Sequence, residues 1–304
     1  MHVSIIIVNY NTLELLRQCL CSIFEKTSDI DFEIIVVDND SHDGSRQMLK
    51  EEFSNVLLIE SQKNLGFGNA NNLGAKYAKG KYLFFLNTDT ILLNNSVKIL
   101  AEFLDNNPEA GICGGNLFSE DMQPALSYTM FLPSIIWELH LILNIEKILY
   151  GKNLMFNHTG RSIEVGYITG ADLMIRSDIF NQLKGFDSDF FMYFEECELT
   201  FRCKKLRYKC YNIPQAQIIH LEGKSISNDK YRSKLYLESR KLYYQKTHGS
   251  FYLWMANQAL FASLLFRIFV HTFVRRKMRQ KYINRFILTF NFLNPRNNLC
   301  MSQV

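Results

Sequence analysis

Short apolar runs alternate with segments of helical periodicity along the first part of the chain. The run over 3–9 is continuous and rich in β-branched residues, as expected for a strand buried on both faces. The segment 13–24 instead has apolar residues at 13, 16, 20, 23 and 24, the spacing of one helix face. This alternation predicts an α/β fold, with an open, mostly parallel sheet and helices on both faces. The predicted strands are 3–9, 32–38, 56–60, 82–86 and 111–114, and the predicted helices are 13–24, 43–53, 69–78 and 96–104.

The pattern is less regular in the second half. Residues 131–150 are apolar and aromatic, and the polar segment 229–248 has the length of a long helix. Residues 251–274 are again apolar apart from Arg267 and His271, a basic cluster follows at 275–281, and 283–293 is apolar apart from Arg285. Further strands are predicted at 167–175, 209–213 and 217–220, and further helices at 177–183 and 196–205.

A parallel sheet also predicts where a ligand lies. In open α/β sheets the ligand site is beyond the carboxyl ends of the strands. In this chain that rule selects 9–11, 38–41 and 87–89, all of which are polar segments that follow an apolar strand.

Charge divides the chain into two regions. Residues 1–238 hold 23 Lys and Arg against 30 Asp and Glu, whereas 239–304 hold 11 Lys and Arg and no acidic residue. The resulting charges of −7 and +11 indicate an acidic body with a basic tail, and basic tails meet nucleic acid or anionic lipid. With 47% hydrophobic and 21% charged residues, the composition excludes a disordered chain.

The cysteines and the N-terminus favour a cytoplasmic protein. The seven cysteines form no Cys-x-x-Cys pair and no zinc spacing, so we expect free thiols in a reducing compartment. The first apolar run is too short for a secretory signal and no basic segment precedes it. The longest candidate for a membrane span, Phe251–Phe266, ends before Arg267.

Two aspartates follow predicted strands directly. Asp89 is placed either to bind a divalent cation that bridges substrate phosphates or to cap the next helix. Asp38 is placed to accept a hydrogen bond from a nucleoside, or to shape a tight turn. The segment 64–72 is a glycine-containing loop that runs into a helix and suits a phosphate, although it lacks the Lys-Ser/Thr of a P-loop.

Two adjacent carboxylates, Glu195 and Glu196, follow five aromatic or apolar residues. Apolar surroundings raise the pKa of a carboxylate towards that of a useful general base. The alternative is an ordinary helix start with acidic residues in its first turn. His220 stands at a strand end, either as a structural residue or as a ligand.

Together and in this order, these segments resemble the family 2 glycosyltransferases of the GT-A fold, in particular their rhamnosyltransferase-like branch. The resemblance covers about 3–248 and implies a Rossmann-like sheet. It is carried by Val3-Ser-Ile-Ile-Ile-Val-Asn-Tyr-Asn11, Val37-Asp-Asn-Asp-Ser41, Asn64-Leu-Gly-Phe67 with Asn71-Asn72, Asn87-Thr-Asp89, Thr169-Gly-Ala-Asp-Leu-Met-Ile-Arg176, Gly185-Phe-Asp-x-x-Phe-Phe-Met-Tyr-Phe-Glu-Glu196, and His220 followed by Ser225.

The resemblance implies a role for each matching residue. Glu196 is implied as the base that deprotonates the acceptor hydroxyl, with Glu195 beside it. Asp89 is implied to bind Mg²⁺ or Mn²⁺ on the donor diphosphate, with His220 as a further ligand. The acceptor side is implied at Gly170, Ala171 and Asp172. The residues implied to bind the nucleotide and donor are Asn9, Asn11, Asp38, Asn64, Gly66, Asn71, Asn87, Thr88 and Asp89.

The implied reaction is a single in-line displacement that inverts the anomeric carbon of a nucleoside-diphosphate sugar. A dTDP-rhamnose donor is favoured, with UDP-hexose or UDP-HexNAc as the alternative, and the expected acceptor is a lipid-linked or cell-surface glycan. Asn87 and Glu196 both depart from the aspartates usual in the family, and Glu198 stands where Asp is usual. A nucleotidyltransferase and a non-catalytic sugar-nucleotide-binding protein are the alternatives from other classes.

The sequence therefore predicts a catalytic domain over 1–248, with a donor half (1–115) and an acceptor half (116–248), followed by a helical basic tail over 249–304. An apolar helix beside a basic cluster suits the surface of an anionic membrane. We expect peripheral attachment at the inner face of the plasma membrane, because lipid-linked acceptors are met there. A helical cap on the catalytic domain and a nucleic-acid-binding tail are the alternatives.

Overall fold

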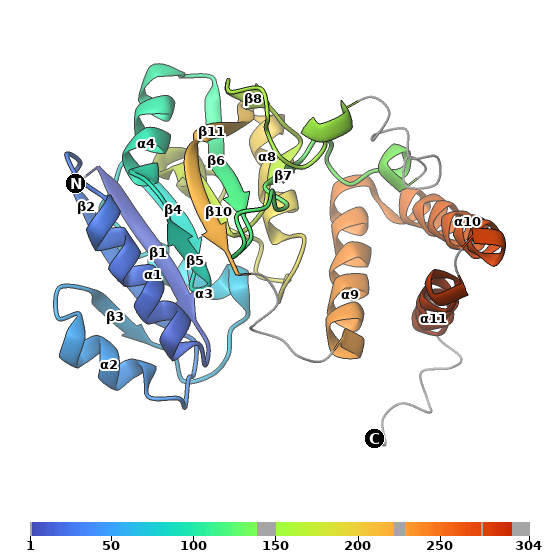
Figure 1. Ribbon diagram of the computed structural model, residues 1–304, viewed down its shortest axis with the longest axis horizontal. Helices are drawn as coiled ribbons and strands as arrows, with labels where there is room; N and C mark the ends of the chain where they lie inside the picture. The colour runs from blue at the N-terminus through green and yellow to red at the C-terminus, as the bar shows by residue number, and fades with distance from the viewer. Residues whose placement is uncertain (1, 139–149, 222–228, 275, 294–304) are drawn as a thin grey trace. The chain divides into compact units, whose positions relative to one another are not determined.

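The computed structural model describes residues 2–138, 150–221, 229–274 and 276–293 (Figure 1). The chain folds into two compact units. Unit 1 consists of Met1–Leu132 and Lys152–Asn228, and unit 2 consists of Pro133–Gly151 and Asp229–Val304. Most of the predicted apolar segment 131–150 and the position of Ser225 lie outside the described residues.

Unit 1 is built on a sheet in which the predicted parallel strands are confirmed. Strands β1 (Val3–Asn9), β2 (Phe32–Asp38), β3 (Leu57–Glu60) and β4 (Tyr82–Asn87) are parallel, in the order β3-β2-β1-β4. Asn9 is paired with Asp38, and Val8 with Asn87. The three strands therefore end level with one another, and this brings the predicted polar segments to one edge.

Alternation along the buried strands produces two apolar layers. Ile5 and Ile7 belong to a core that includes Leu16 and Leu20 of helix α1 (Leu13–Lys26). Ile6, between them, belongs to a second core on the other face. The remaining helices of the first half are α2 (Ser45–Glu52), α3 (Phe67–Ala75) and α4 (Ser96–Asn106). The predicted layers of helices around a sheet are confirmed (Figure 1).

The second half of unit 1 extends the sheet with strands of mixed direction. β10 (Asp172–Arg176) lies antiparallel between β4 and β6 (Ala110–Phe118), and β11 (Lys209–His220) is parallel to β6. The short strand β5 (Thr90–Leu92) pairs with the end of β11. Helices α7 (Ser177–Gln182) and α8 (Glu195–Lys205) follow β10. Smaller elements are β7 (Tyr128–Thr129), β8 (Ile163–Glu164), β9 (Tyr167–Ile168) and a 3₁₀ turn at Gly151–Asn153.

Three sequence predictions differ from this structure. The predicted strand 167–175 is two strands, β9 and β10, separated by a turn. The predicted strands 209–213 and 217–220 are one strand, because β11 continues through an irregularity in its pairing with β6. The strand β5 was not predicted, since three residues are too few to produce a periodic signal.

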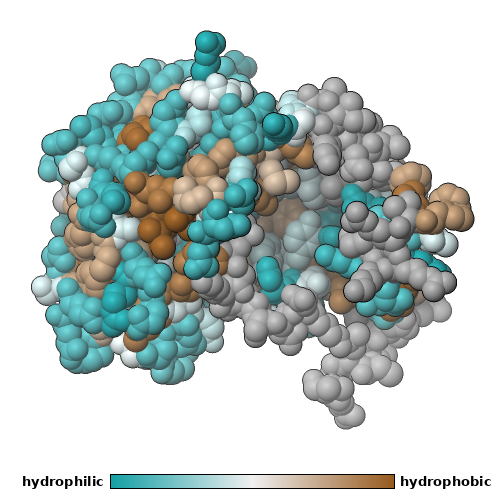
Figure 2. All heavy atoms as spheres, viewed as in Figure 1, coloured by the Kyte–Doolittle hydropathy of each residue, from teal (hydrophilic) through white to brown (hydrophobic). Residues whose placement is uncertain are grey.

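Unit 2 is helical and contains α9 (Asp229–His248), α10 (Ser250–Val274) and α11 (Arg276–Leu293). The sequence predicts a domain boundary after 248, whereas the compact units divide before α9. The surface of unit 1 is mainly hydrophilic, with hydrophobic side chains gathered in limited areas (Figure 2).

Candidate active site

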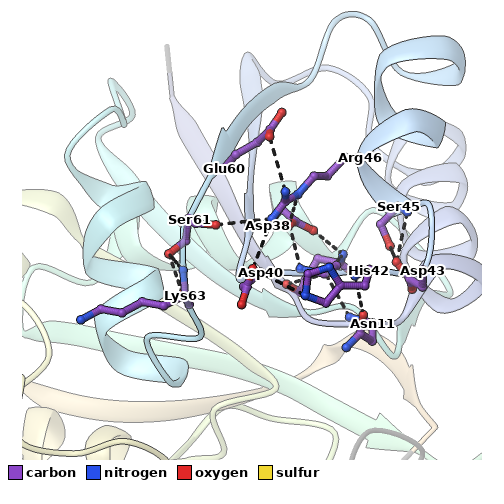
Figure 3. A network of polar contacts seen from close by, with 12 residues as sticks. Asn11, Asp38, Asp40, His42, Asp43, Ser45, Arg46, Glu60, Ser61 and Lys63 are labelled. Atoms are coloured by element: carbon purple, nitrogen blue, oxygen red, sulfur yellow. Dashed lines mark hydrogen bonds and ion pairs between the residues drawn. The ribbon is translucent and has the colours of Figure 1, made fainter.

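The turn after β2 is built around the carboxylate of Asp38, which is fully buried (Figure 3). Asn9 Nδ2 donates to Asp38 Oδ2 at 3.0 Å, and the Ser41 backbone N–H donates to Oδ1 at 3.0 Å. Arg46, in the first turn of α2, donates to the same Oδ1 through Nε. Burial alone would raise the pKa of Asp38, but hydrogen bonds from Ser41, Arg46 and Asn9 outweigh it and lower the pKa. Asp38 is therefore held ionised at neutral pH.

Arg46 connects this turn to two further carboxylates. Its terminal nitrogens lie 3.9 Å from Asp40 Oδ1 and 3.7 Å from Glu60 Oε2 (Figure 3). The Arg46 side chain is 30% exposed, whereas that of Asp38 is 0% exposed. The sequence implied that Asp38 contacts the nucleotide, whereas in this structure its carboxylate has no exposed surface and is bonded to Arg46. The accessible side chains at this turn include Asp40, His42 and Asn11.

A chain of hydrogen bonds joins the ends of β1 and β4. Asn9 Oδ1 accepts from the Thr12 hydroxyl at 2.8 Å, and Thr12 Oγ1 lies 3.0 Å from Thr88 Oγ1, whose hydroxyl can donate to it. All three side chains are buried. Asn9, implied by the sequence as a donor contact, has no exposed surface, so it supports Asp38 from within the protein.

Asp89 and His220 come together because Asp89 directly precedes the short strand β5, and the end of β11, which holds His220, pairs with β5. His220 is paired with Thr90, and the Leu221 N–H donates to the Asp89 carbonyl at 2.8 Å. His220 Nε2 lies 3.3 Å from Asp89 Oδ1. The predicted metal ligands are therefore neighbours, although they are 131 positions apart in the sequence.

This pair fits a divalent cation by the chemistry of its donor atoms. Mg²⁺ and Mn²⁺ accept carboxylate oxygens, and imidazole suits first-row metals. Within the described ranges, no group of three or more His, Cys, Asp and Glu side chains could hold a metal ion. A cation held by Asp89 and His220 would therefore take its other ligands from phosphate oxygens and water.

The loop before α3 is fastened to the turn after β2. Asn39 Nδ2 donates to Asn64 Oδ1 at 3.0 Å, and the Gly66 N–H donates to the same oxygen at 2.9 Å. Gly66 has φ of +80°, and a Cβ at this residue would lie 2.2 Å from the Phe191 carbonyl oxygen. Only glycine permits this approach. Of the two residues implied as donor contacts, Asn64 therefore connects this loop to the turn after β2, and Gly66 lets it approach the segment before α8.

Asparagine side chains of α3 hold the same segment. Asn69 Nδ2 donates to the Ser188 carbonyl at 3.0 Å. Asn72 Nδ2 donates to the Phe186 carbonyl at 2.7 Å, and Asn72 Oδ1 accepts from the Phe186 N–H at 2.8 Å. Asn71, implied as a donor contact, is only 1% exposed and bonds within its own helix. The α3 asparagines thus position the chain that leads to the two glutamates.

Glu195 and Glu196 begin α8 in surroundings that disfavour their charge. Glu195 is 4% exposed, Glu196 is partly buried, and no group in the described part of the chain bonds to Oε2 of either. Burial, reinforced by the neighbouring Glu196, raises the pKa of Glu195 well above its usual value. Burial raises the pKa of Glu196 to about 7. A carboxylate with this pKa can accept a proton at neutral pH.

The backbone before these glutamates is in a conformation that bulky residues rarely adopt. Tyr193 and Phe194 have φ of 71° and 67°, in the left-handed region. Such residues persist where the surrounding structure holds them, and they cluster at functional sites. Gly68 of α3 packs here: a Cβ at Gly68 would lie 3.6 Å from Glu195 Cβ.

Glu198, one turn further, belongs to the scaffold. Arg202 Nε lies 2.7 Å from Glu198 Oε1. The same guanidinium donates to the Leu183 carbonyl at 2.6 Å and to the Gly185 carbonyl at 2.9 Å. Glu198 therefore holds the arginine that fixes the end of α7.

The turn before β10 lies beside the end of β4. The Ala171 carbonyl accepts from the Asn87 N–H at 3.0 Å, and Gly170 lies against the ring of Phe67. Asp172 differs from the sequence expectation, because it is fully buried and its Oδ2 accepts from the Gly115 N–H at 2.5 Å. Burial raises the pKa of Asp172 well above its usual value. Asp172 therefore belongs to the interior of the sheet, whereas Gly170 and Ala171 stay candidates for the acceptor side.

Comparison with known proteins identifies this arrangement. The family model described as "Glycosyl transferase family 2" matches residues 4–168, which is more than half of the chain. The chain belongs to glycosyltransferase family 2. The match includes the ends of β1, β2 and β4, where the polar segments described above lie.

Curated family 2 relatives match at low identity. An N-acetylglucosaminyl-diphospho-decaprenol L-rhamnosyltransferase from Mycobacterium tuberculosis is 26% identical over 214 residues, which is 64% of this chain and 68% of that protein. A UDP-Glc:alpha-D-GlcNAc-diphosphoundecaprenol beta-1,3-glucosyltransferase from Escherichia coli is 31% identical over 107 residues, 34% of this chain and 42% of that protein. The family 2 assignment and the resemblance to rhamnosyltransferases are thereby confirmed.

Solved structures of glycosyltransferases share the fold. A mannosyltransferase from Pyrobaculum calidifontis in complex with GDP-Man and Mn²⁺ aligns with a TM-score of 0.61 at 15% identity, over 96% of this chain and 84% of that one. Residues 1–349 of S. aureus TarS in complex with UDP align with a TM-score of 0.54 at 16% identity, over 98% and 83%. At these identities the likeness concerns the fold, and the predicted GT-A fold is confirmed.

Sequence reasoning missed several residues that organise this family 2 site. Arg46, Asn39 and Thr12 were not singled out, although each makes hydrogen bonds to a predicted residue. Thr12 and Asn39 could have been found from their positions close to predicted strand ends, whereas Arg46 lies further along, in the following helix. Asn69 and Asn72 lay inside the recognised loop and helix, but their contacts join residues more than 100 positions away.

Proposed function

We propose that this protein is an inverting glycosyltransferase that transfers a sugar from a nucleoside-diphosphate sugar to a hydroxyl group of a lipid-linked or cell-surface glycan. The observation that carries this proposal is the pair of carboxylates at the start of α8. Glu196 has a pKa raised to about 7 by burial, and its Oε2 has no bonding partner among the described residues. A base of this strength suits removal of a hydroxyl proton at neutral pH.

In the proposed reaction, Glu196 Oε2 takes the proton of the acceptor hydroxyl as its oxygen attacks the anomeric carbon. The bond from that carbon to the diphosphate oxygen breaks on the opposite face, and the electron pair leaves with the nucleoside diphosphate. Configuration at the anomeric carbon is therefore inverted. Glu195 stays protonated beside Glu196, because both carboxylates in this buried site would repel each other if ionised.

Asp89 and His220 are the residues that would hold a Mg²⁺ or Mn²⁺ ion. When bound, such a cation supplies Lewis-acid stabilisation of the charge on the departing diphosphate. The Mn²⁺ in the Pyrobaculum calidifontis mannosyltransferase complex supports a divalent cation in this fold. Asp38, fixed by Arg46, belongs to the nucleotide end of the site.

The donor and the acceptor are assigned by similarity. The L-rhamnosyltransferase relative favours dTDP-rhamnose, and the glucosyltransferase relative supports a UDP-hexose or UDP-HexNAc as the alternative. Both relatives are named for polyprenyl-diphosphate-linked acceptors, which supports a lipid-linked acceptor in polysaccharide synthesis. We place the reaction at the inner face of the plasma membrane, with the protein attached peripherally.

The test combines donor binding with transfer in matched variants. Sugar nucleotides with and without Mg²⁺ or Mn²⁺ are screened by thermal stabilisation, because a ligand of the native state raises apparent stability with its concentration. Glu196→Gln is expected to lower the transfer rate by about 10²–10⁴-fold while donor binding is retained. Asp89→Ala is expected to lose cation-dependent donor binding, and Glu109→Gln, at an exposed position, serves as control.

Two outcomes would point to another class. Incorporation of a nucleotide into the product would indicate a nucleotidyltransferase. Donor binding without transfer in every acceptor tested, together with identical behaviour of Glu196→Gln and the native protein, would indicate a non-catalytic binding protein.

A further inference from the structure

One face of α10 is apolar and exposed to solvent. Exposed residues at 251, 254, 258, 262, 265, 269 and 273 recur at intervals of three or four, so they line one side of the helix, with Gln258 as the polar member. Phe266 and Thr272, beside this line, are also exposed. Phe251 and Phe273, near the two ends, are 71% and 76% exposed. The apolar members are Phe251, Trp254, Ala262, Leu265, Phe269 and Phe273.

The opposite side of α10 is packed within unit 2. Leu260 and Leu264 are buried, and the ring of Phe261 lies 5.5 Å from that of Phe286 in α11. Arg267 ends the longest apolar run of the sequence, and in the structure its guanidinium donates to the Tyr282 hydroxyl at 2.9 Å. Because Arg267 points towards α11, no charged residue interrupts the exposed face.

The second helix of this antiparallel pair supplies the charge. Arg279, Lys281 and Arg285 of α11 are exposed, and the segment 275–281 contains five Lys and Arg. No acidic residue occurs from 239 to 304. An exposed aromatic face beside a purely cationic surface matches the interfacial layer of an anionic bilayer, where acyl chains meet negative headgroups.

We propose that the exposed face of α10 lies in the headgroup–acyl boundary of an anionic phospholipid bilayer, with the helix axis parallel to the membrane. This names the lipid-contacting surface and therefore rests on the membrane location in the proposed function. Among the described residues, Ser250–Phe273 also has the length and the apolar composition of a helix that could cross a membrane. A crossing, however, would carry the cations of 275–281 away from the catalytic side, against the positive-inside bias.

The first test measures binding of the full-length protein to vesicles, without donor or acceptor. Vesicles contain either phosphatidylcholine alone or equal parts of phosphatidylcholine and phosphatidylglycerol. Binding is expected with phosphatidylglycerol only, and to weaken about fivefold for each cation removed in Arg279→Gln and Lys281→Gln. The double variant Trp254→Ser/Phe269→Ser is expected to bind about tenfold more weakly or less. Tyr77→Ser, an exposed aromatic of unit 1, is the matched control.

The second test measures depth with a single tryptophan. The chain has two tryptophans, Trp137 and Trp254, so Trp137→Phe leaves Trp254 as the single fluorophore. A second variant replaces both tryptophans by Phe and carries Leu265→Trp, which reports on the middle of α10. Lipids carrying a quencher near the headgroup are expected to quench both positions equally. Deep quenching at position 265 alone would indicate a spanning helix and overturn the proposal.

Two further results would also overturn it. Trp254 fluorescence that vesicles leave unchanged would show that the face does not enter a bilayer. A blue shift that depends on protein concentration without lipid would assign the face to a second copy of the chain. A transfer assay with a water-soluble acceptor separates this failure from failure of the proposed reaction, because that assay needs no membrane.

Discussion

The buried carboxylates of unit 1 are of two kinds, distinguished by their hydrogen-bond donors. Asp38 receives bonds from Asn9, Ser41 and Arg46, which lower its pKa despite burial. Glu195 and Glu196 are in apolar surroundings, and burial raises the pKa of both. The carboxyl group is therefore kept charged in the turn after β2 and kept ready to bind a proton at the start of α8.

This difference makes a prediction about stability. The pKa of Glu196 is raised in the folded protein from about 4.5 to about 7, so its ionisation opposes folding as pH rises through this window. Glu196→Gln is therefore expected to stabilise the protein at pH 8 by up to about 3 kcal/mol, and to have no stabilising effect at pH 4.

Thermal unfolding of the native protein, Glu196→Gln and Glu109→Gln at the two pH values provides the measurement. A midpoint for Glu196→Gln at pH 8 equal to that of the native protein would show that Glu196 ionises without cost, contrary to this account.

At the scale of elements, α3 connects the turn after β2 to the segment that leads into α8. Its preceding loop is bonded to Asn39 in the turn after β2, and its own asparagines bond to the segment that leads into α8. The helix therefore contacts both ends of the site. Asn69 and Asn72 make these connections, whereas Asn71, the residue of α3 that the sequence implied as a donor contact, bonds within the helix.

Asn72 makes the most direct test of this role. Asn72→Leu removes both bonds to the backbone of Phe186 and is expected to cost about 1–3 kcal/mol. The variant is expected to displace Glu195 and Glu196 and thereby to lower kcat, whereas the donor dissociation constant should change little. Asn106→Leu, which removes an exposed amide bonded within α4, is the matched control. A loss of donor affinity with unchanged kcat would instead indicate that Asn72 contacts the donor.

The elements that the sequence predicts correctly are those with a strong local pattern. β1, β2 and β4 are continuous apolar runs, and their common end follows from the parallel sheet. The split between β9 and β10 and the short β5 depend on partners distant in the chain. Helix α3 begins at Phe67, two residues earlier than predicted, because its entry is set by the loop contact with Phe191.

At the scale of the whole molecule, the division of the chain follows contacts that no local pattern predicts. In unit 2, Arg240 of α9 forms a buried ion pair with Glu138, 2.7 Å between Nε and Oε1. The same guanidinium bonds to the Ala256 carbonyl and to Asn257 in α10. These bonds join α9 to α10, and α9 therefore belongs with the helices that follow it. Removal of one partner of the buried Arg240–Glu138 pair is expected to cost about 3–5 kcal/mol.

The candidate site was predictable in its positions but not in its internal bonds. The strand ends and the Glu195–Glu196 pair could be selected from sequence, since each follows an apolar run. The ion pair between Arg46 and Asp38 and the burial of Asp172 in the sheet depend on how side chains from separate elements meet. These contacts change the roles expected for Asp38, Asn9, Asn71 and Asp172.

The central claim is that Glu196 is the base in glycosyl transfer, and the pH dependence of transfer tests it most directly. The native protein is expected to lose kcat/KM below a pKa of about 7, because a protonated Glu196 cannot accept the hydroxyl proton. In Glu196→Gln the rate should be lower by about 10²–10⁴-fold and this pH dependence should be absent. Native-like transfer by Glu196→Gln, with the same dependence on pH, would contradict the account.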